Sequence, residues 1–126
     1  MTPKELVDTA SRDHADMAGL VRRLREALDA GDHDLMQSLL RELLMVEVRH
    51  YATEEALMRA VAYDDADTHR RQHVEMVDTL KRIVQTLVVE NLASVSPQIV
   101  AHFETALAHM IGADQRLNNF VSASAA

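Results

Sequence analysis

The stretch HYATEEALM, residues 50–58, carries the pattern on which the predicted fold depends. Its apolar residues continue a helical stripe, with Val46 one turn before His50 and Leu57 near the other end. His50 and Glu54 are four residues apart, so both lie on that stripe. A face that packs against other helices would therefore bury an imidazole beside a carboxylate, and both groups need partners there.

Helix-capping signals divide the chain into four predicted helices. TPKE at residues 2–5 opens the first helix, and Gly31 favours its end. Asp32 caps the second helix, and Ser96 followed by Pro97 opens the fourth. We therefore expect helices over about residues 2–30, 34–62, 67–90 and from 97 onward, separated by AGDHD, YDDAD and NLASVSP, with a frayed tail SASAA at 122–126.

Short connections make consecutive helices antiparallel neighbours. The predicted fold is therefore all-α, an antiparallel up-down-up-down four-helix bundle, and residues 1–126 suffice for a single domain with one core. The core-facing residues expected from the apolar stripes are Val7, Ala10, Met17, Val21, Leu24, Leu28, Met36, Leu39, Leu43, Val46, Leu57, Val61, Met76, Leu80, Val84, Leu87, Phe103, Leu107, Met110, Leu117 and Val121.

The composition restricts the class of protein. The formal charge is −7, so the chain lacks the basic footprint that nucleic acids and anionic membrane surfaces require. It has no cysteine, which excludes disulfides, thiolate metal sites and iron–sulfur clusters. The first residues lack a signal-peptide pattern, and no apolar run approaches the roughly 18 residues of a membrane span. We expect a cytoplasmic protein without nucleic-acid or membrane partners, whose acidic, polar surface suits a monomer.

Polar residues interrupt the apolar stripes of all four helices at one level of the bundle. Counting from the shared turns at about 1.5 Å per residue places Glu54 level with His73 and His73 level with Asp114. The same count around residue 31 places His14 nearly level with His50. The seven residues that share this level are His14, His50, Glu54, His69, His73, His109 and Asp114.

Five imidazoles and two carboxylates buried together indicate a metal site, because a cation satisfies all of their lone pairs at once. Nitrogen and oxygen ligands suit iron, manganese, copper or zinc, and seven ligands exceed one tetrahedral zinc site. Two metals bridged by two carboxylates is the economical arrangement. His109 and Asp114 are the awkward pair, because five residues span about 140° beyond a full turn of an ideal helix. Gly112 between them would ease a local distortion.

These residues resemble the hemerythrin family, in particular its bacterial single-domain members, the bacteriohemerythrins. The family has an early His, then H-[FY]-x-x-E-E-x-x-M, then Y-P-x-x-x-x-H-x-x-x-H, then H-[IM]-x-x-x-D-x-x-L. This chain has DHADM at 13–17, HYATEEALM at 50–58, YDDADTHRRQH at 63–73 and HMIGADQRL at 109–117. The resemblance spans essentially the whole chain and includes the five-residue step between His109 and Asp114.

The resemblance implies two iron ions that cycle between Fe2+ and Fe3+, with O2 as their ligand and a solvent-derived oxygen as a third bridge. Three histidines would bind one iron and two the other, which leaves one coordination position open for O2. The ligands that the resemblance implies are His69, His73 and His109 for one iron, His14 and His50 for the other, and Glu54 and Asp114 as bridges to both.

The chain departs from the family pattern at two places. Asp64 follows Tyr63 where the family usually has Pro, which affects only the turn. Thr105 stands four residues before His109 where the family often has Trp, and the chain has no Trp. A smaller side chain there would widen the O2 pocket or admit water, so we expect the O2 affinity and the autoxidation rate to change.

The other polar residues of the stripes are expected to have lesser roles. His33 lies in a polar turn and should be solvated, and His102 lies roughly 10 Å along the helix from His109, too far to be a ligand. Glu47, one turn before His50, is a further candidate for orienting a ligand. The residues expected to act only in packing are Tyr51, Met17, Met58, Met76 and Met110.

The leading hypothesis is reversible O2 binding at a non-haem di-iron centre, by a carrier, store or local supplier of oxygen that is not an enzyme. A local supplier of O2 would have an O2-consuming enzyme as its partner. One alternative is an O2 or redox sensor, which would need a separate signalling partner. Another is a di-iron peroxidase or nitric-oxide-handling enzyme, for which the sequence offers no additional acid or base. A metal-free bundle is disfavoured because seven buried polar groups would lack partners.

Overall fold

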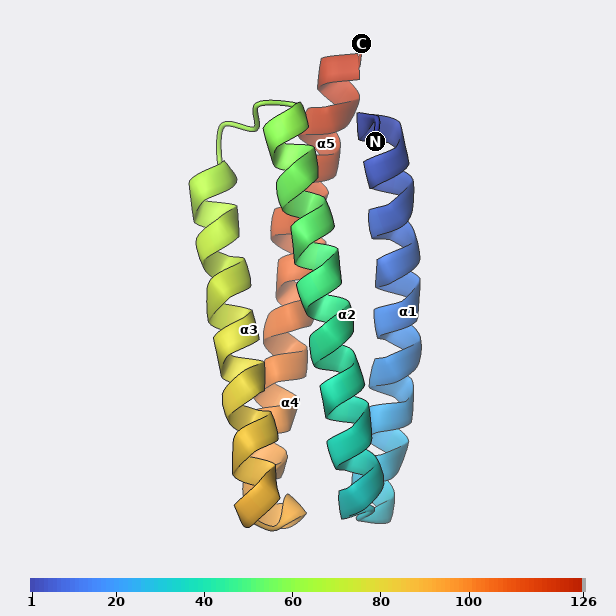
Figure 1. Cartoon of the computed structure of the whole chain (residues 1–126), viewed down its shortest axis with the longest axis vertical. Coiled ribbons are helices and arrows are strands. Elements are labelled where there is room, and N and C mark those ends of the chain that lie inside the picture. Colours follow the sequence, from blue (N-terminus) through green and yellow to red (C-terminus); the bar gives the residue numbers. More distant parts are fainter. Residues whose placement is uncertain (126) are drawn as a thin grey trace.

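The computed structural model describes the backbone of residues 1–125 and the side chains of residues 1–124. It consists of four antiparallel helical rods (Figure 1). This arrangement confirms the predicted all-α, up-down-up-down bundle, and the N-terminus and α5 lie at the same end (Figure 1). The rods are α1 (Pro3–Ala30), α2 (His33–Ala60), α3 (Ala66–Val89) and a composite of α4 (Leu92–His109), the π-helical segment η1 (Met110–Asp114) and α5 (Gln115–Ala125).

The capping residues of the first two helices act as predicted. The hydroxyl of Thr2 accepts a hydrogen bond from the backbone N–H of Glu5 at 3.1 Å. Gly31 ends α1 with a φ of 66°, a left-handed conformation that glycine adopts without steric cost. The carboxylate of Asp32 accepts from the backbone N–H of Leu35 at 3.1 Å and opens α2. These local contacts account for the tight turn between the helices.

The fourth rod begins earlier than predicted, so the expected start at Ser96 and Pro97 is wrong. The Asn91 side chain caps α4 by accepting from the backbone N–H of Ser94 at 2.9 Å. Leu92 is buried in the first turn. This burial and the cap offset the backbone hydrogen bond that Pro97 removes from inside the helix. Most of the segment expected to be a loop is therefore helix.

The remaining helix ends lie within two residues of the predicted ones, with α2 over His33–Ala60 and α3 over Ala66–Val89. The exception is the tail SASAA, which was expected to be frayed. The helix α5 continues to Ala125, so that prediction is wrong over 122–125, and residue 126 lies outside the described part of the chain.

The segment η1 explains the five-residue step between His109 and Asp114. In a π-helix each N–H bonds to the carbonyl five residues back, so residues five apart lie one turn apart. His109 and Asp114 therefore face the same side of the rod, and both are buried. A Cβ on Gly112 would come no closer than 3.5 Å to its nearest neighbour, the Arg116 guanidinium. The π segment therefore gives Gly112 no steric reason to be glycine.

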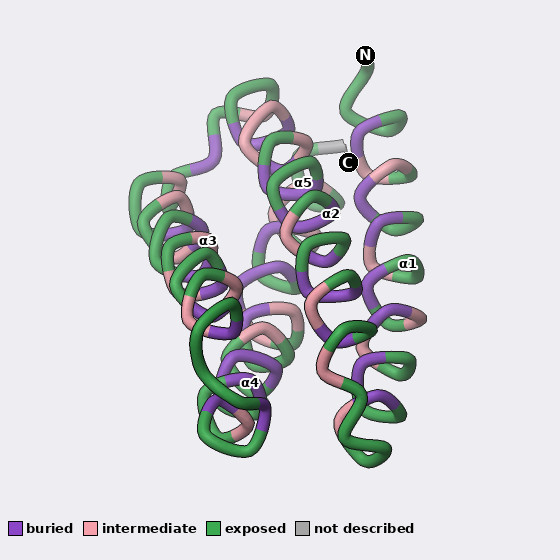
Figure 2. Tube along the Cα trace, turned by 60° about the horizontal axis from the view of Figure 1, so that its bottom comes forward, coloured by how far each residue is buried: buried purple, intermediate pink, exposed green. Residues whose placement is uncertain are grey.

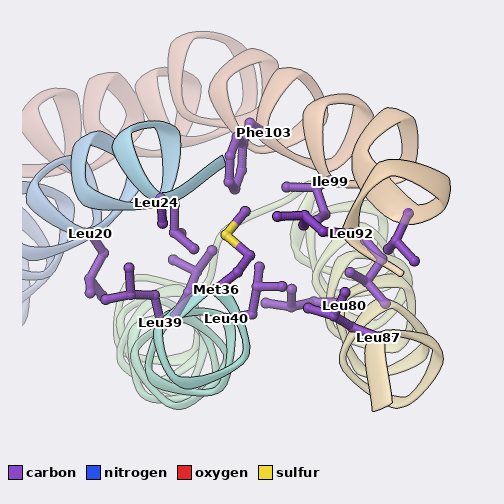
Figure 3. Close-up of a cluster of buried hydrophobic side chains, with 14 of the residues drawn as sticks. Leu20, Leu24, Met36, Leu39, Leu40, Leu80, Leu87, Leu92, Ile99 and Phe103 are labelled. Carbon is purple, nitrogen blue, oxygen red and sulfur yellow. The ribbon is translucent and has the colours of Figure 1, made fainter. Parts of the chain in front are cut away.

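The buried residues face the axis of the bundle (Figure 2) and form two apolar clusters with polar residues between them. Figure 3 shows the larger cluster, which lies toward the α1–α2 and α3–α4 connections and includes Leu24, Met36 and Leu80. The smaller cluster lies toward the α2–α3 connection and consists of Leu6, Leu57, Met58, Tyr63 and Leu117. The polar layer is therefore sealed by apolar side chains on both sides.

One predicted core residue is wrong. Leu107 is 52% exposed, whereas Phe103 and Leu117 are buried as expected. The buried face of α4 runs through Val95, Ile99, His102 and Phe103 to His109, and Leu107 lies at the edge of this face rather than on it.

Within the described residues, every helix falls short of the length and apolar character that crossing a lipid bilayer demands.

Candidate metal centre

The seven polar residues predicted to share one level do meet between the two apolar clusters. Six of them are buried, and the side chain of His14 is 24% exposed. Each of the five histidines directs its Nε2 atom toward a carboxylate of the layer. Their donor atoms form two groups, each with all members within 4.8 Å of one another, namely Glu54, His69, His73, His109 and Asp114, and His14, His50, Glu54 and Asp114.

Asp114 faces histidines of both groups with different oxygens. Its Oδ2 atom lies 3.0 Å from His14 Nε2. Its Oδ1 atom lies 2.9 Å from His109 Nε2 and 3.2 Å from His69 Nε2. A carboxylate whose two oxygens face two sets of donors has the arrangement that a bridge between two cations requires.

Glu54 occupies the corresponding position on α2. Its Oε1 atom lies 2.9 Å from His73 Nε2 and 3.4 Å from His69 Nε2, both in the first group. The same atom lies 3.5 Å from His50 Nε2 in the second group. The two carboxylates therefore belong to both groups, while each histidine belongs to only one.

Asp13, which was not among the residues predicted for the site, faces the outer side of His50. The Asp13 carboxylate is buried and lies 3.5 Å from His50 Nδ1. Its other oxygen accepts two hydrogen bonds from Arg49, at 2.8 Å and 3.1 Å. A carboxylate behind a metal-binding imidazole usually orients it by accepting a hydrogen bond from the outer nitrogen. Asp13 lies in this position behind His50 but makes no such hydrogen bond in this structure.

Two further side chains lie behind the histidines of the larger group. His109 Nδ1–H donates to the Gln72 side-chain oxygen at 3.1 Å, which fixes the ring. Glu55 lies 3.6 Å from His73 Nδ1, beyond hydrogen-bond distance, and its other oxygen lies 3.6 Å from the Arg70 guanidinium. His73 therefore has a weaker support on its outer side than His109.

The carboxylates and imidazoles shift one another's pKa values. Burial by itself would raise the pKa of Asp114 and Glu54, but hydrogen bonds from the histidines lower both, that of Asp114 far below its usual range. Burial would lower the pKa of His69, yet the carboxylates of Asp114 and Glu54 beside it raise it to about 9. Burial lowers the pKa of His73. The layer thus stabilises ionised carboxylates by positive charge, whether protons or a metal supply it.

The donor set fits a pair of metal ions better than it fits protons alone. Nε2 of His50, Nε2 of His109 and Oδ1 of Asp114 are buried and make no hydrogen bond to any described residue. Unsatisfied buried polar atoms are costly, and here they cluster with their lone pairs directed at one another. Imidazole nitrogen and carboxylate oxygen are ligands for iron, manganese, copper or zinc. A cation within each group would satisfy these atoms.

Two cavities lie beside α4, and one of them reaches the polar layer. A cavity of about 590 Å³ between α3 and α4 is lined by Thr105, Gln72 and His109. A cavity of about 300 Å³ between α1 and α4 is lined mainly by apolar side chains, including Met17 and Met110. Thr105 therefore opens the side of the layer that holds His109, whereas the cavity between α1 and α4 reaches Glu47 and His102 and none of the seven donors.

His33 is less solvated than expected. Its Nε2–H donates to the backbone carbonyl of Leu87 at 2.9 Å and lies 3.3 Å from that of Glu90. It therefore caps the C-terminal end of α3 from the start of α2, which the local sequence around a polar turn does not reveal.

Three residues expected to have lesser roles form a buried polar chain. His102 and Glu47 are both buried, and they make a hydrogen bond of 2.9 Å to each other. The Tyr51 hydroxyl donates to the other oxygen of Glu47 at 3.0 Å. Tyr51 therefore makes a buried hydrogen bond in addition to its packing contacts. His102 is likewise a buried, hydrogen-bonded residue. Met17, Met58 and Met76 fill the core as expected, and Met110 is half-buried.

A sequence signal for Asp13, Glu47 and His102 existed. Each is a polar residue at a position that helical spacing assigns to a buried face, as the selected ligands are. The sequence did not predict their hydrogen-bond partners. Asp13 pairs with Arg49, Glu47 with Tyr51, and His102 with Glu47, and these pairs are identified only in the packed bundle.

Comparison with known proteins places this layer in a wider context. Residues 5–116 match the family model described as the hemerythrin HHE cation binding domain. The chain is 28% identical over 76 residues to a protein named myohemerythrin from Theromyzon tessulatum, and this match covers 60% of the chain and 63% of the relative. The alignment therefore spans less than two thirds of that relative's length. No solved structure matches the chain significantly.

Proposed function

The chain belongs to the hemerythrin family, and from this premise we propose that it binds two iron ions and, through them, O2 in a reversible manner. In this proposal the protein is a carrier, store or local supplier of O2 and not an enzyme. Residues 1–126 act as one domain, because both apolar clusters and the polar layer draw on α1, α2 and the fourth rod.

The ligand assignment follows the two groups of donors. The observation that carries it is that the groups share both carboxylates but divide the histidines three to two. The group with fewer histidines has one fewer protein donor, which leaves a position for an external ligand. The proposed ligands are His69, His73 and His109 for one iron, His14 and His50 for the other, and Glu54 and Asp114 for both.

A pair of ferrous ions supplies the two electrons that O2 takes up when it binds and returns when it leaves. The protein's contribution is to orient the ligands and to limit the access of water. Gln72 holds the outer nitrogen of His109 by a hydrogen bond, and the Asp13 carboxylate faces the outer nitrogen of His50 at 3.5 Å. The cavity between α3 and α4 reaches His109, so it gives a small molecule such as O2 access to the donor layer.

Anaerobic loading with Fe(II), followed by cycles of O2 addition and removal, tests this proposal. Metal analysis should give two iron ions per chain, and the optical spectrum should change on adding O2 and return on removing it over several cycles. Loading with Mn(II) or Zn(II) in parallel tests the choice of metal. A folded protein that takes up no iron would refute the site. Two iron ions with a single irreversible oxidation would refute reversible binding and favour an enzyme.

A further inference from the structure

A buried hydrogen-bonded chain connects α4 to the histidine layer through α2. The Glu47 carboxylate accepts from His102 Nε2–H at 2.9 Å with one oxygen and from the Tyr51 hydroxyl at 3.0 Å with the other. All three residues are buried, Glu47 at 1% exposure. These three hydrogen-bonded residues lie beside the polar layer, and none of them belongs to either group of donors.

The far end of this chain covers a proposed metal ligand. The Tyr51 ring stacks on the His73 ring, with centroids 4.1 Å apart and planes inclined by 11°. The Tyr51 hydroxyl also lies 3.6 Å from the sulfur of Met76, so it contacts both Glu47 and Met76 while the face of the ring packs on His73. A near-parallel stack at this distance restricts tilting of the imidazole.

His73 lacks a hydrogen bond from the described residues at its outer nitrogen, whereas His109 has one. His109 has a hydrogen bond from Nδ1 to Gln72 at 3.1 Å. His73 Nδ1 is buried and has no hydrogen-bond partner among the described residues, since Glu55 lies 3.6 Å away. Metal-binding histidines are normally oriented by a hydrogen bond to the outer nitrogen. For His73, the stacked tyrosine takes that role.

The position of Tyr51 depends in turn on Glu47 and His102. A buried carboxylate is tolerated only with hydrogen-bond donors, and the described residues supply two to Glu47, one on each oxygen. Removing the His102 donor leaves one oxygen of Glu47 without a partner among the described residues, so the carboxylate is held on one side only and can rotate. This rotation weakens its hold on the Tyr51 hydroxyl.

We propose that His102 is a positioning residue for His73, acting through Glu47 and Tyr51. This inference rests on the proposed function only in taking His73 as an iron ligand. It assigns a role to a histidine on α4 that contacts neither donor group.

The motion of the Tyr51 ring tests the first half of the inference without iron. In a Tyr63→Phe background Tyr51 is the chain's remaining tyrosine, so its ring signals in an NMR spectrum of labelled protein are unambiguous. We expect slow ring flips, with separate signals for the two ring edges, and faster, averaged signals after His102→Leu. His102→Gln, whose amide can donate to Glu47, should restore slow flips. Ile99→Ala, one turn away in the apolar cluster of Figure 3, is the matched control and should leave them slow.

Iron release to a chelator tests the second half. Loss of a residue that orients a ligand typically costs about 10- to 100-fold in metal affinity, so His102→Leu should speed release by a comparable factor and His102→Gln should reverse most of it. If His102→Leu does not fold, Tyr51→Phe keeps the stacked ring but cuts the link to Glu47, and it should speed release in the same way. Unchanged ring flips and unchanged release in folded variants would overturn the inference. Failure of the wild type to take up iron would instead refute the proposed function, and the ring flips would still decide whether His102 orders Tyr51.

Discussion

Replacing His73 with alanine should weaken one of the two proposed iron sites and leave the other largely intact. His73 is buried, and its Nε2 lies 2.9 Å from Glu54 Oε1 in the group with three histidines. The group that contains His14 and His50 lacks His73 and keeps all its own donors. The variant should therefore bind clearly fewer than two iron ions per chain.

The thermal effect can be worked out from linkage. At free iron 100 times the dissociation constant, each site stabilises the fold by about 2.7 kcal/mol, so two sites contribute about 5.4 kcal/mol. Residues that only orient a ligand cost up to about 100-fold in affinity, and loss of a ligand should cost at least this much. A site weakened 100-fold contributes only about 0.4 kcal/mol at the same iron concentration, which lowers the total to about 3.1 kcal/mol. For a chain of this length the iron-induced rise in Tm should shrink by roughly 7 to 12 °C.

The assay compares Tm with and without Fe(II) for each protein under anaerobic conditions. This difference removes the cost of deleting the imidazole, which also leaves Tyr51 without its stacking partner. Free imidazole in the buffer should restore part of the lost iron binding by filling the space. His33→Ala is the control, because His33 bonds to the backbone at the end of α3. A folded His73→Ala protein with two iron ions and an undiminished Tm rise would show that the ligand assignment is wrong.

Three further predictions concern water access, the π segment and pH. Thr105→Trp should fill part of the cavity beside His109 and slow autoxidation, followed as loss of the O2-bound spectrum, and an unchanged rate would count against a wet cavity. Gly112→Ala should fold, bind iron normally and gain up to about 1 kcal/mol in urea unfolding, whereas lost iron binding would mean that the π segment requires glycine. The pKa of His69 is raised from 6.5 to about 9, so its charged form stabilises the iron-free fold fully below pH 6.5 and that contribution disappears as the pH rises through 9. The Tm of iron-free protein should therefore fall from pH 7 toward pH 9.5 more than that of the iron-loaded protein, and equal slopes would contradict this.

The geometry of the donor layer was largely predictable because it depends on quantities that a sequence contains. Helical spacing puts His50 and Glu54 on one face, and short connections force antiparallel neighbours. With those two facts, residue counts from each turn give the height of every donor along the bundle. The step from His109 to Asp114 was the exception, because the π turn that aligns them is a tertiary response to the packing on both sides.

The start of α4 shows how local signals can mislead. Pro97 after Ser96 is a good helix opening, but Asn91 is an equally good cap, and no local rule decides between them. Burial of Leu92 in the larger apolar cluster decides for Asn91. The choice depends on the depth to which neighbouring helices extend, which the sequence around residue 97 does not specify.

By itself, the sequence determined that four helices would run antiparallel and that seven nitrogen- and oxygen-bearing side chains would meet at one level, because both follow from periodicity and chain length. Only the tertiary structure decided which side chains lie behind the donors and orient them. Asp13 of α1 faces His50 of α2, and His102 of α4 bonds to Glu47 of α2, which bonds in turn to Tyr51. Such pairings depend on the rotation of each helix about its axis and on side-chain rotamers, which are settled only when the whole bundle packs.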